Sequence, residues 1–479
     1  MPARRLTTAV LVAAATVVFG VRASAHVGSP DVYVDTSAGT YRLLVTVRPP
    51  RVIPGVAEVS IRIPDANVER VRITPLPLTG PGAQFAPTPD VASRASDDPH
   101  TFSGSLWMMS AGAWQVRIAV DGDRGAASAS VPVPTLPQAT MEMSGPLAIV
   151  LFALMLLLAG GLVGIVSALA RDAPLAPGER PDLRAVRRGR IAGGVTAAAM
   201  IVVVLLGNRW WNAEASSYGR YVYKPLHAAA AVNAAGQLAI TLTDPGWIPL
   251  RRVDDIVDDH GHPMHLFIVT ASLDRFWHLH PVDEGSGRFV QALPPMPPGR
   301  YEFFADIVHA TGISETATGT IDVPPISGTP LSGDDSAWSA DDPASGIEWV
   351  GDRSPKRKAL TMFTFDVKDE GGAPARDLEL YMGMPGHAVF IRRDRQVFAH
   401  VHPSGSAPMA AMEIGQRSLE SGSNATAAPM DHAAHMHANA LPSTVTFPYG
   451  LPQPGDYRIF VQVKRAGHIE TAAFDTHVD

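Results

Sequence analysis

The most telling absence in this chain is cysteine. Its 479 residues contain none, which excludes disulfides, iron–sulfur clusters, covalently attached c-type haem and a copper–thiolate site. Any bound metal ion must therefore be held by histidine, methionine, a carboxylate or the backbone. Charged residues are also scarce at 18%, which argues against a disordered chain.

The net charge of −7 favours neither a nucleic-acid partner nor an anionic membrane surface. The chain also lacks a nucleophile motif, a phosphate-binding loop and a nucleotide fingerprint. By contrast, 46% of the residues are hydrophobic and the mean hydropathy is slightly positive, which indicates membrane segments. The 42 glycines and 42 prolines are typical of many short strands and turns.

Residues 1–25 read MPARRLTTAVLVAAATVVFGVRASA. Two arginines, an apolar run and an Ala-Ser-Ala ending are the pattern of a secretory signal peptide. Cleavage after Ala25 makes His26 the first residue of the mature chain. The alternative is an uncleaved membrane anchor.

Two apolar runs, 145–170 and 191–207, are each long enough to be transmembrane helices. The loop between them, 171–190, carries six arginines and is therefore predicted to be cytoplasmic. Both soluble portions then lie on the periplasmic side of a bacterial inner (cytoplasmic) membrane, in agreement with the signal peptide. The lipid bilayer is accordingly one expected partner.

Three segments alternate apolar and polar residues in short runs punctuated by proline and glycine: 26–136, 227–325 and 346–479. A Ser/Gly/Asp/Pro-rich linker, 326–345, separates the last two. This pattern predicts a mainly β fold with three extracytoplasmic β-sandwich domains, immunoglobulin-like or cupredoxin-like, plus the two transmembrane helices.

The last two β segments repeat each other at a constant offset. HGHPMHLFIVTASLDRFWHLHP (260–281) aligns with MGMPGHAVFIRRDRQVFAHVHP (382–403), and PPGRYEFFADI aligns further on with QPGDYRIFVQV. The second copy carries an insert, 404–442, that holds the extra residues between these blocks. One domain has therefore been duplicated.

The repeated histidines favour a metal site. His-x-His on a strand places both imidazoles on one face, because side chains alternate with period two. A hairpin turn centred near Ser272–Leu273 pairs His265 with His280, and His278 joins them.

The equivalent hairpin turn in the second copy pairs His387 with His402, and His400 is the third histidine of that set. Each repeat is thus predicted to present three imidazoles to one ion. A register slip of one residue would send the lone histidine to the opposite face. The alternative is that these are core histidines bonded to the backbone.

The two copies differ in ligand type. His260 and His262 of the first correspond to Met382 and Met384 of the second. Cu(I) accepts both imidazole and thioether, whereas zinc seldom takes thioether, so copper, as Cu(I) or Cu(II), is the expected metal and zinc the alternative. Met382 and Met384 also fit an apolar core. His309 is a further candidate without a histidine counterpart.

The insert 404–442 contains a Met/His tract in surroundings that look flexible. Such a tract fits a copper-collecting loop, or else a solvated polar loop without ligands. Its candidate ligands are Met430, His432, His435, Met436 and His437. In the N-terminal domain, the α-amino group and imidazole of a mature His26 can chelate Cu(II), and His100 can complete the site. An exposed terminal histidine and a loop histidine are the alternative.

Several stretches also resemble a known family. HVGSPDVYVDTSAGTYRLLVTVRPPRVIPG and GSLWMMSAGAWQVRIAV resemble the YtkA-like or FixH-like secreted β-domain of bacterial membrane proteins. DDHGHPMHLFIV, FWHLHP and YEFFADIVHATG, and in the second copy MGMPGHAVFI, FAHVHPSGSAPMAAM and FPYGLPQPGDYRIFVQVKR, resemble the duplicated domains of the same proteins.

This resemblance covers most of the chain and implies architecture together with a metal-binding or copper-related role. His26 and His100 are separately similar to the copper-resistance protein C family. His262 departs from the pattern, since a lysine-like polar residue is expected there, and so implies a first site richer in ligands.

Three classes of function remain open. The first is a membrane-tethered copper-binding protein for homeostasis, resistance or delivery, with a copper-exporting or copper-receiving membrane protein as partner. The second is a copper- or zinc-dependent enzyme with a three-histidine site, although no carboxylate base is evident in the motif. The third is a scaffold or assembly protein with structural histidines. The absence of catalytic motifs favours a non-enzyme.

Overall fold

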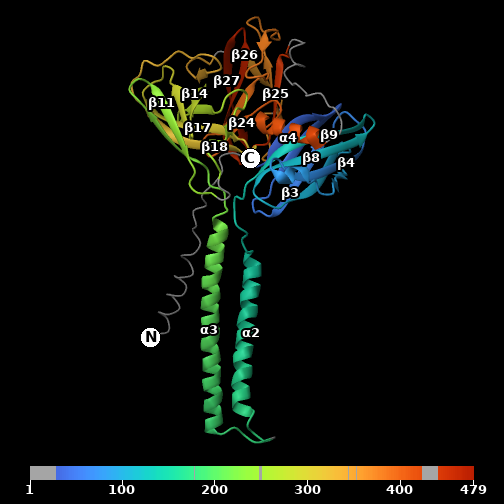
Figure 1. The fold of residues 1–479 in the computed structure, drawn as a ribbon, viewed down its shortest axis with the longest axis vertical. Helices are drawn as coiled ribbons and strands as arrows, with labels where there is room; N and C mark the ends of the chain where they lie inside the picture. The colour runs from blue at the N-terminus through green and yellow to red at the C-terminus, as the bar shows by residue number, and fades with distance from the viewer. Residues whose placement is uncertain (1–28, 177, 248–250, 344, 352, 423–440) are drawn as a thin grey trace. The chain divides into compact units, whose positions relative to one another are not determined.

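The computed structural model describes residues 29–176, 178–247, 251–343, 345–351, 353–422 and 441–479. They form two compact units. One comprises the described residues up to Gln138 and from Tyr223 onwards, and the other comprises Ala139–Val222. The first unit consists of antiparallel sheets and the second of two long helices (Figure 1), which confirms the mainly β fold with two long apolar helices.

The N-terminal domain is a two-sheet sandwich. One sheet has the order β1 (Val32–Ala38), β2 (Tyr41–Arg48), β3 (Gly55–Arg62), β7 (Thr101–Met108) and β6 (Ser93–Arg94). The other has the order β5 (Asp90–Val91), β4 (Val68–Pro77), β8 (Gly112–Gly122) and β9 (Gly125–Thr135), and a short 3₁₀ helix, η1, spans Pro81–Gln84. Alternate residues from both sheets form its core.

The first repeat is a second sandwich. One sheet has the order β10 (His227–Val232), β11 (Gln237–Thr243), β16 (Arg288–Ala292) and β15 (Val282–Gly285). The other has the order β12 (Ile256–Val257), β17 (Gly299–His309), β13 (His265–Val269), β14 (Arg275–Leu279) and β19 (Ser336–Ser339), with β18 (Ser314–Val323) also paired to β17. β11 alternates buried and exposed residues because only one of its faces is covered.

The second repeat follows the same plan. One sheet has the order β20 (Ile347–Val350), β21 (Thr361–Val367) and β25 (Thr444–Tyr449). The other has the order β22 (Leu378–Glu379), β26 (Gly455–Arg465), β23 (His387–Arg392) and β24 (Phe398–Val401), with β27 (His468–Val478) paired to β26. The helix α4 (Met409–Gly422) follows β24 in sequence.

The two repeats pack against each other through matching strands. Every residue of β13 is buried because one face covers its own sandwich core and the other faces the second repeat. The rings of Phe276 and Phe460 stack with centroids 4.3 Å apart, and those of Phe398 and Phe304 stack at 4.4 Å. Phe276 and Phe398 are equivalent positions of the two repeats, and so are Phe304 and Phe460. The same contact is therefore made twice, with the two repeats exchanging roles. The repeats are therefore related by an approximate two-fold axis.

The helical unit contains α2 (Gly145–Asp172) and α3 (Leu183–Gly219), both long and apolar enough to cross a membrane. Small residues let them approach closely: Ser167 Oγ donates to the carbonyl of Gly189 at 3.0 Å. In the β unit, the Tyr223 amide donates to the carbonyl of Pro137 at 2.7 Å. This bond joins the chain just before the hairpin to the chain just after it.

Three segments differ from their expected form. The linker 326–345 contains β19, which extends the sheet of the first repeat through β14. In the loop 171–190, α3 already begins at Leu183, because Asp182 accepts a hydrogen bond from the Ala185 amide and caps the helix. The insert 404–442 contains α4, whose Gly415 packs closely on Ser130 of β9.

Candidate metal centre

The hairpin register places the histidines as predicted. Leu266 pairs with Leu279 and Phe267 with His278, which is the register that sets His265 opposite His280. In the second repeat, Val389 pairs with His400 in the corresponding register. The predicted registers are therefore confirmed, and the histidines of both hairpins lie on the faces that meet between the repeats.

A tight turn before each hairpin adds a further residue to this interface. Asp259 and His262 exchange backbone hydrogen bonds, which leaves His260 (φ 56°) and Gly261 (φ 82°) as a two-residue loop with both φ angles positive. This is the type I′ pattern, which favours glycine at its second central position. Met382 (φ 51°) and Gly383 (φ 79°) form the same turn in the second repeat.

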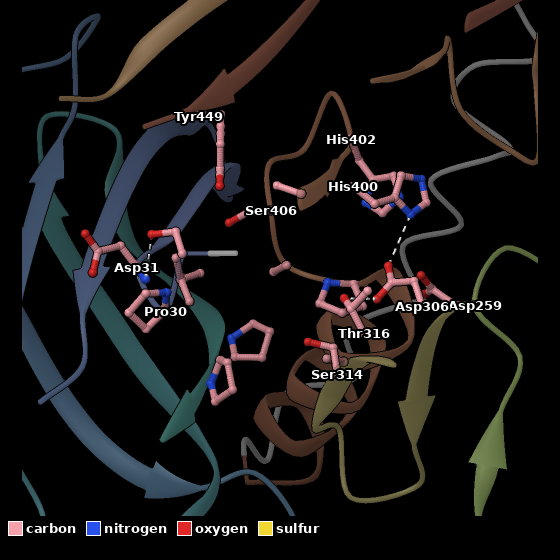
Figure 2. A pocket seen from close by; sticks show the side chains of 18 of the residues that line it. Pro30, Asp31, Asp259, Asp306, Ser314, Thr316, His400, His402, Ser406 and Tyr449 are labelled. Atoms are coloured by element: carbon pink, nitrogen blue, oxygen red, sulfur yellow. Dashed lines mark hydrogen bonds and ion pairs between the residues drawn. The ribbon is translucent and has the colours of Figure 1, made fainter. Parts of the chain in front are cut away.

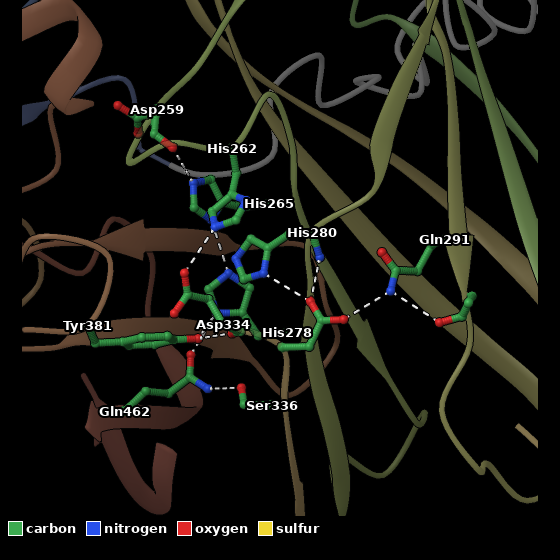
Figure 3. Close-up of polar contacts among 12 residues, drawn as sticks. Asp259, His262, His265, His278, His280, Gln291, Asp334, Ser336, Tyr381 and Gln462 are labelled. Atoms are coloured by element: carbon green, nitrogen blue, oxygen red, sulfur yellow. Dashed lines mark hydrogen bonds and ion pairs between the residues drawn. The ribbon is translucent and has the colours of Figure 1, made fainter. Parts of the chain in front are cut away.

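A first histidine group comprises His265, His278 and His280, whose ligand nitrogens all lie within 4.8 Å of one another. Each ring is oriented by an acceptor on its other nitrogen. His265 Nε2 lies 3.0 Å from the carbonyl of Asp259, His278 Nδ1 lies 2.8 Å from Gln462 Oε1, and His280 Nδ1 lies 3.0 Å from Asp335 Oδ1 (Figure 3). Second-shell acceptors of this kind accompany most metal-bound histidines.

These partners determine where the ring protons are. A carbonyl only accepts, so His265 Nε2 carries its proton and Nδ1 has a free lone pair. Gln462 Nε2 donates to Ser336 Oγ at 2.6 Å, so its Oε1 accepts from His278 Nδ1 and leaves His278 Nε2 unprotonated. In this tautomer, His265 Nδ1 and His278 Nε2 face each other at 3.1 Å with both lone pairs available to an ion.

An ion bound between those two nitrogens relieves the repulsion of their lone pairs. Nitrogen ligands about 2.0–2.1 Å from a tetrahedral ion lie about 3.3–3.4 Å apart, close to the separation here. His280 Nε2 completes the group: it is buried and has no hydrogen-bond partner among the described residues. The first group thus offers three ring nitrogens, all within 4.8 Å of one another, to one ion.

A second histidine group comprises His260, His387 and His402, and it spans both repeats. His260 comes from the turn of the first repeat, with Nδ1 3.1 Å from the carbonyl of Met382 and Nε2 3.1 Å from His402 Nε2. His387 Nε2 lies 3.1 Å from the carbonyl of Tyr381, which leaves the lone pair of His387 Nδ1 available to an ion.

His400 adjoins the second group. Its Nε2 lies 3.1 Å from His387 Nδ1, and its Nδ1 lies 3.3 Å from Asp306 Oδ2 of the first repeat. The predicted grouping of His387, His400 and His402 is therefore reproduced only in part, because His260 of the first repeat joins His387 and His402, whereas His400 lies beside His387 outside that group.

The imidazoles are held in their neutral, metal-binding form. Burial, followed by the presence of neighbouring imidazoles, lowers the pKa well below its usual value at His265, His278, His387, His400 and His402. The pKa values of His260 and His280 are lowered in the same direction and mainly by burial. The side chain of His262 stacks on His280 with ring centroids 3.9 Å apart.

Carboxylates surround the histidines without displacing them. Asp335 and Asp334 lie beside His280 and His262. On the other side, Asp306 lies beside His400, and burial together with nearby Asp259 raises the pKa of Asp306 to about 7. These acids supply negative charge close to any bound cation.

A small cavity of about 100 Å³ adjoins the second group. His400, His402, Asp259 and Asp306 line one side, while Asp31 and other residues of the N-terminal domain line the opposite side (Figure 2). Asp259 also links this wall to α4, because its Oδ1 accepts from the Ala410 amide at 2.8 Å. The N-terminal domain and α4 therefore cover this end of the histidines.

Other predicted ligands lie elsewhere. His309 Nδ1 is bonded to Asp255 Oδ1 at 2.7 Å, outside both groups, and His100 is in the N-terminal domain, where its amide is bonded to Asp98. Met384 lines a groove of about 570 Å³ with Met409 and Met412. The remaining candidates fall outside the described residues: His26, Met430, His432, His435, Met436 and His437.

Gln462 was not anticipated from the motif, although its position has a signal. It is a polar residue inside the otherwise apolar run IFVQV, and Asp306 occupies the equivalent place in FFADI. Each accepts from a histidine of the opposite repeat. Asp334 and Asp335, which lie in the presumed linker, had no comparable signal.

Replacing Gln462 with leucine is expected to weaken metal binding by about 10- to 100-fold, the usual effect of losing an outer-shell partner. The reason is that His278 Nδ1 loses its acceptor and the ring is no longer oriented. A competition titration against a chelator of known affinity measures the change. Gln453→Leu is the matched control, since Gln453 contacts Arg392. Equal affinities in both variants would contradict the assigned role.

Comparison with known protein families finds one matching domain, in the C-terminal part of the chain. A family model for a domain of unknown function, DUF8832, matches residues 342–479, which is less than half of the chain and corresponds to the second repeat with its histidines. The family description names no activity. No curated protein matches the chain.

Solved structures align with the chain only loosely. They include an engineered protein (12% identity, TM-score 0.16, 19% of this chain and 20% of that one) and a tetra-tandem repeat in the extending region of a large adhesion protein (9%, 0.16, 90% and 72%). A third is dimeric latent PorU from Porphyromonas gingivalis (9%, 0.15, 94% and 34%). The chain spans well under two thirds of the first and third, and TM-scores this low carry no argument about function.

Proposed function

We propose that this chain is a membrane-anchored, extracytoplasmic copper-binding protein that holds its ion between two β-sandwich repeats. The observation that carries the proposal is the first histidine group. Three buried ring nitrogens converge there, and each ring is oriented by an acceptor on its opposite side. Core histidines bonded to the backbone would not need unprotonated nitrogens facing one another.

Copper is proposed over zinc because of the donor set. The chain has no cysteine, and a methionine stands in one repeat where a histidine stands in the other. Imidazole and thioether together suit copper, and zinc seldom takes thioether. The resemblance to YtkA-like or FixH-like proteins is consistent with this choice and remains a prediction.

A carrier or storage role in copper homeostasis, resistance or delivery fits the site better than catalysis. His278 and His387 are 0% exposed, and the adjoining cavity of about 100 Å³ has room for only a few water molecules. This space is small for an organic substrate of ordinary size. Delivery further implies a membrane protein that donates or receives copper.

The membrane placement rests on the helical hairpin and its arginines. The Tyr223–Pro137 hydrogen bond joins the chain before the helical hairpin to the chain after it. Both ends of a membrane-spanning hairpin therefore lie on the same side of the membrane. The arginines between the helices favour the cytoplasm for the connection. We therefore place the β unit on the periplasmic side of a bacterial inner membrane.

The proposal is tested by titrating the full chain in detergent with Cu(I), Cu(II) and Zn(II) against competing chelators. Wild type is expected to bind copper more tightly than zinc. The double variant His278→Ala with His400→Ala is expected to lose tight binding, because the first group loses a ligand and the second loses the histidine beside His387. Circular dichroism verifies that the variant is folded. The control replaces His227 and His477, which are exposed.

The outcomes separate the three classes of function. Loss of copper binding only in the cluster variant supports the carrier. A preference for zinc contradicts the copper assignment and favours a zinc-dependent hydrolase. Absence of binding, or binding that is equal in both variants, leaves the histidines structural and supports a scaffold.

A further inference from the structure

The first histidine group comes close to the protein surface at one residue. His265 and His278 are buried, and the side chain of His280 is only 4% exposed. The neighbouring side chain of His262 is 25% exposed. An ion that approaches the group from this side therefore meets His262 before it meets the three ligands.

His262 touches the group without belonging to it. Its ring stacks on His280 with centroids 3.9 Å apart and lies 6.0 Å from the ring of His265. It is not one of the three residues whose ligand nitrogens lie within 4.8 Å of one another. Backbone hydrogen bonds with Asp259 fix the main chain of His262 in its tight turn. The imidazole is thus placed to pass an ion to His280 while remaining outside the final ligand set.

Carboxylates lie next to this exposed imidazole. Asp334 Oδ2 is 3.3 Å from His262 Nε2 (Figure 3), and the Asp334 side chain is 29% exposed. Because a carboxylate accepts the proton of Nε2, the lone pair of His262 Nδ1 is available to an ion. Asp335, which bonds His280, adds a second negative charge, and Lys464 Nζ lies 3.9 Å from Asp334 Oδ1. Two carboxylates against one ammonium leave a net negative charge, which attracts cations.

The second repeat differs at the equivalent position, where Met384 stands in place of His262. Met384 is 8% exposed. The N-terminal domain and α4 also cover the side of the second group on which His402 and Asp259 lie. Of the two turns, only the one in the first repeat therefore places an exposed imidazole beside its histidine group.

We infer that His262 and Asp334 form the entry point through which copper reaches the first histidine group. This inference rests on the proposed function, because it requires an ion in that group. The pair captures the cation from solution and passes it to His280, and neither residue remains a ligand of the stored ion. Exchange of one ligand at a time lowers the barrier to uptake without changing the final equilibrium.

The experiment measures copper uptake by the full chain in detergent, with Cu(I) and with Cu(II), as the stopped-flow colour change when a weak chromogenic chelator gives up its ion. The uptake phase that is lost in His280→Ala reports the first group. His262→Ala is expected to slow this phase about tenfold, which corresponds to about 1.4 kcal/mol in the barrier. The equilibrium dissociation constant should stay unchanged. Release into a strong chelator should therefore slow by the same factor.

Asp334→Asn tests the electrostatic part of the inference. It is expected to slow the same phase about tenfold at low ionic strength, the lower end of the usual effect of charge on association, and to reduce the salt dependence of uptake. The matched controls are His227→Ala and Asp322→Asn, which replace exposed residues of β10 and β18. Both controls should take up and release copper as wild type does.

The rates and the affinity together decide between the alternatives. Unchanged uptake in His262→Ala overturns the entry point. A weaker affinity with release that is not slowed also overturns it, because His262 is then a ligand of the stored ion. Both results leave the proposed copper function intact. Failure of wild type to bind any copper overturns the inference and the proposed function together.

Discussion

Copper is expected to stabilise the folded β unit by several kcal/mol, and the stabilisation should vanish without the histidine cluster. A ligand that binds only the folded state adds about 2.7 kcal/mol at 100-fold and about 4.1 kcal/mol at 1,000-fold excess over its dissociation constant. The apo site starts from an unfavourable arrangement, because His265 and His278 present unprotonated nitrogens to each other at 3.1 Å.

Thermal unfolding followed by circular dichroism measures this effect. Wild type should show a higher midpoint with copper, and a chelator should return it to the apo value. His280→Ala combined with His402→Ala should show no shift, since both groups lose a ligand. The exposed His477→Ala variant should keep the full shift. An equal shift in the double variant would mean that copper acts elsewhere on the chain.

The second large effect is expected at the contact between the repeats. Phe276→Ala should lower the free energy of unfolding by about 3–5 kcal/mol, the usual cost of removing a buried aromatic ring. Phe276 is 0% exposed and stacks on Phe460 across the interface. Because His278 follows two residues later and bonds to Gln462 beside Phe460, metal affinity should fall as well.

Phe289→Ala separates the two consequences. Phe289 is equally buried but belongs to the core of the first repeat alone, so its loss should destabilise the protein without weakening metal binding. Chemical denaturation gives the stability of both variants, and competition titration gives their metal affinity. If Phe276→Ala binds copper as tightly as Phe289→Ala, the interface does not organise the site.

Much of the fold follows from local patterns. Alternation predicted the sandwiches, and long apolar runs predicted the two helices. The hairpin registers followed from the position of the turns, because side chains alternate strictly along a strand. These features depend on residues close together in the sequence.

The composition of the site depended on contacts that are remote in sequence. The pairing of His260 with His402 requires the docking of one repeat on the other, which no local pattern specifies. The strongest available signal was β13 itself: its stretch LFIV is apolar on both faces, which indicates that a second surface covers it. The polar Asp306 and Gln462 within apolar strands pointed to the same interface.

The approximate two-fold axis has an evolutionary consequence. In a symmetric homodimer every substitution appears twice, so both halves of an interfacial site must carry the same ligands. Fusion of the two copies into one polypeptide removes that constraint. A His-Gly-His loop can persist in one copy while the other changes to Met-Gly-Met, and a carboxylate can become an amide at one position only. Gene fusion thus allows a once-symmetric pair of positions to specialise independently.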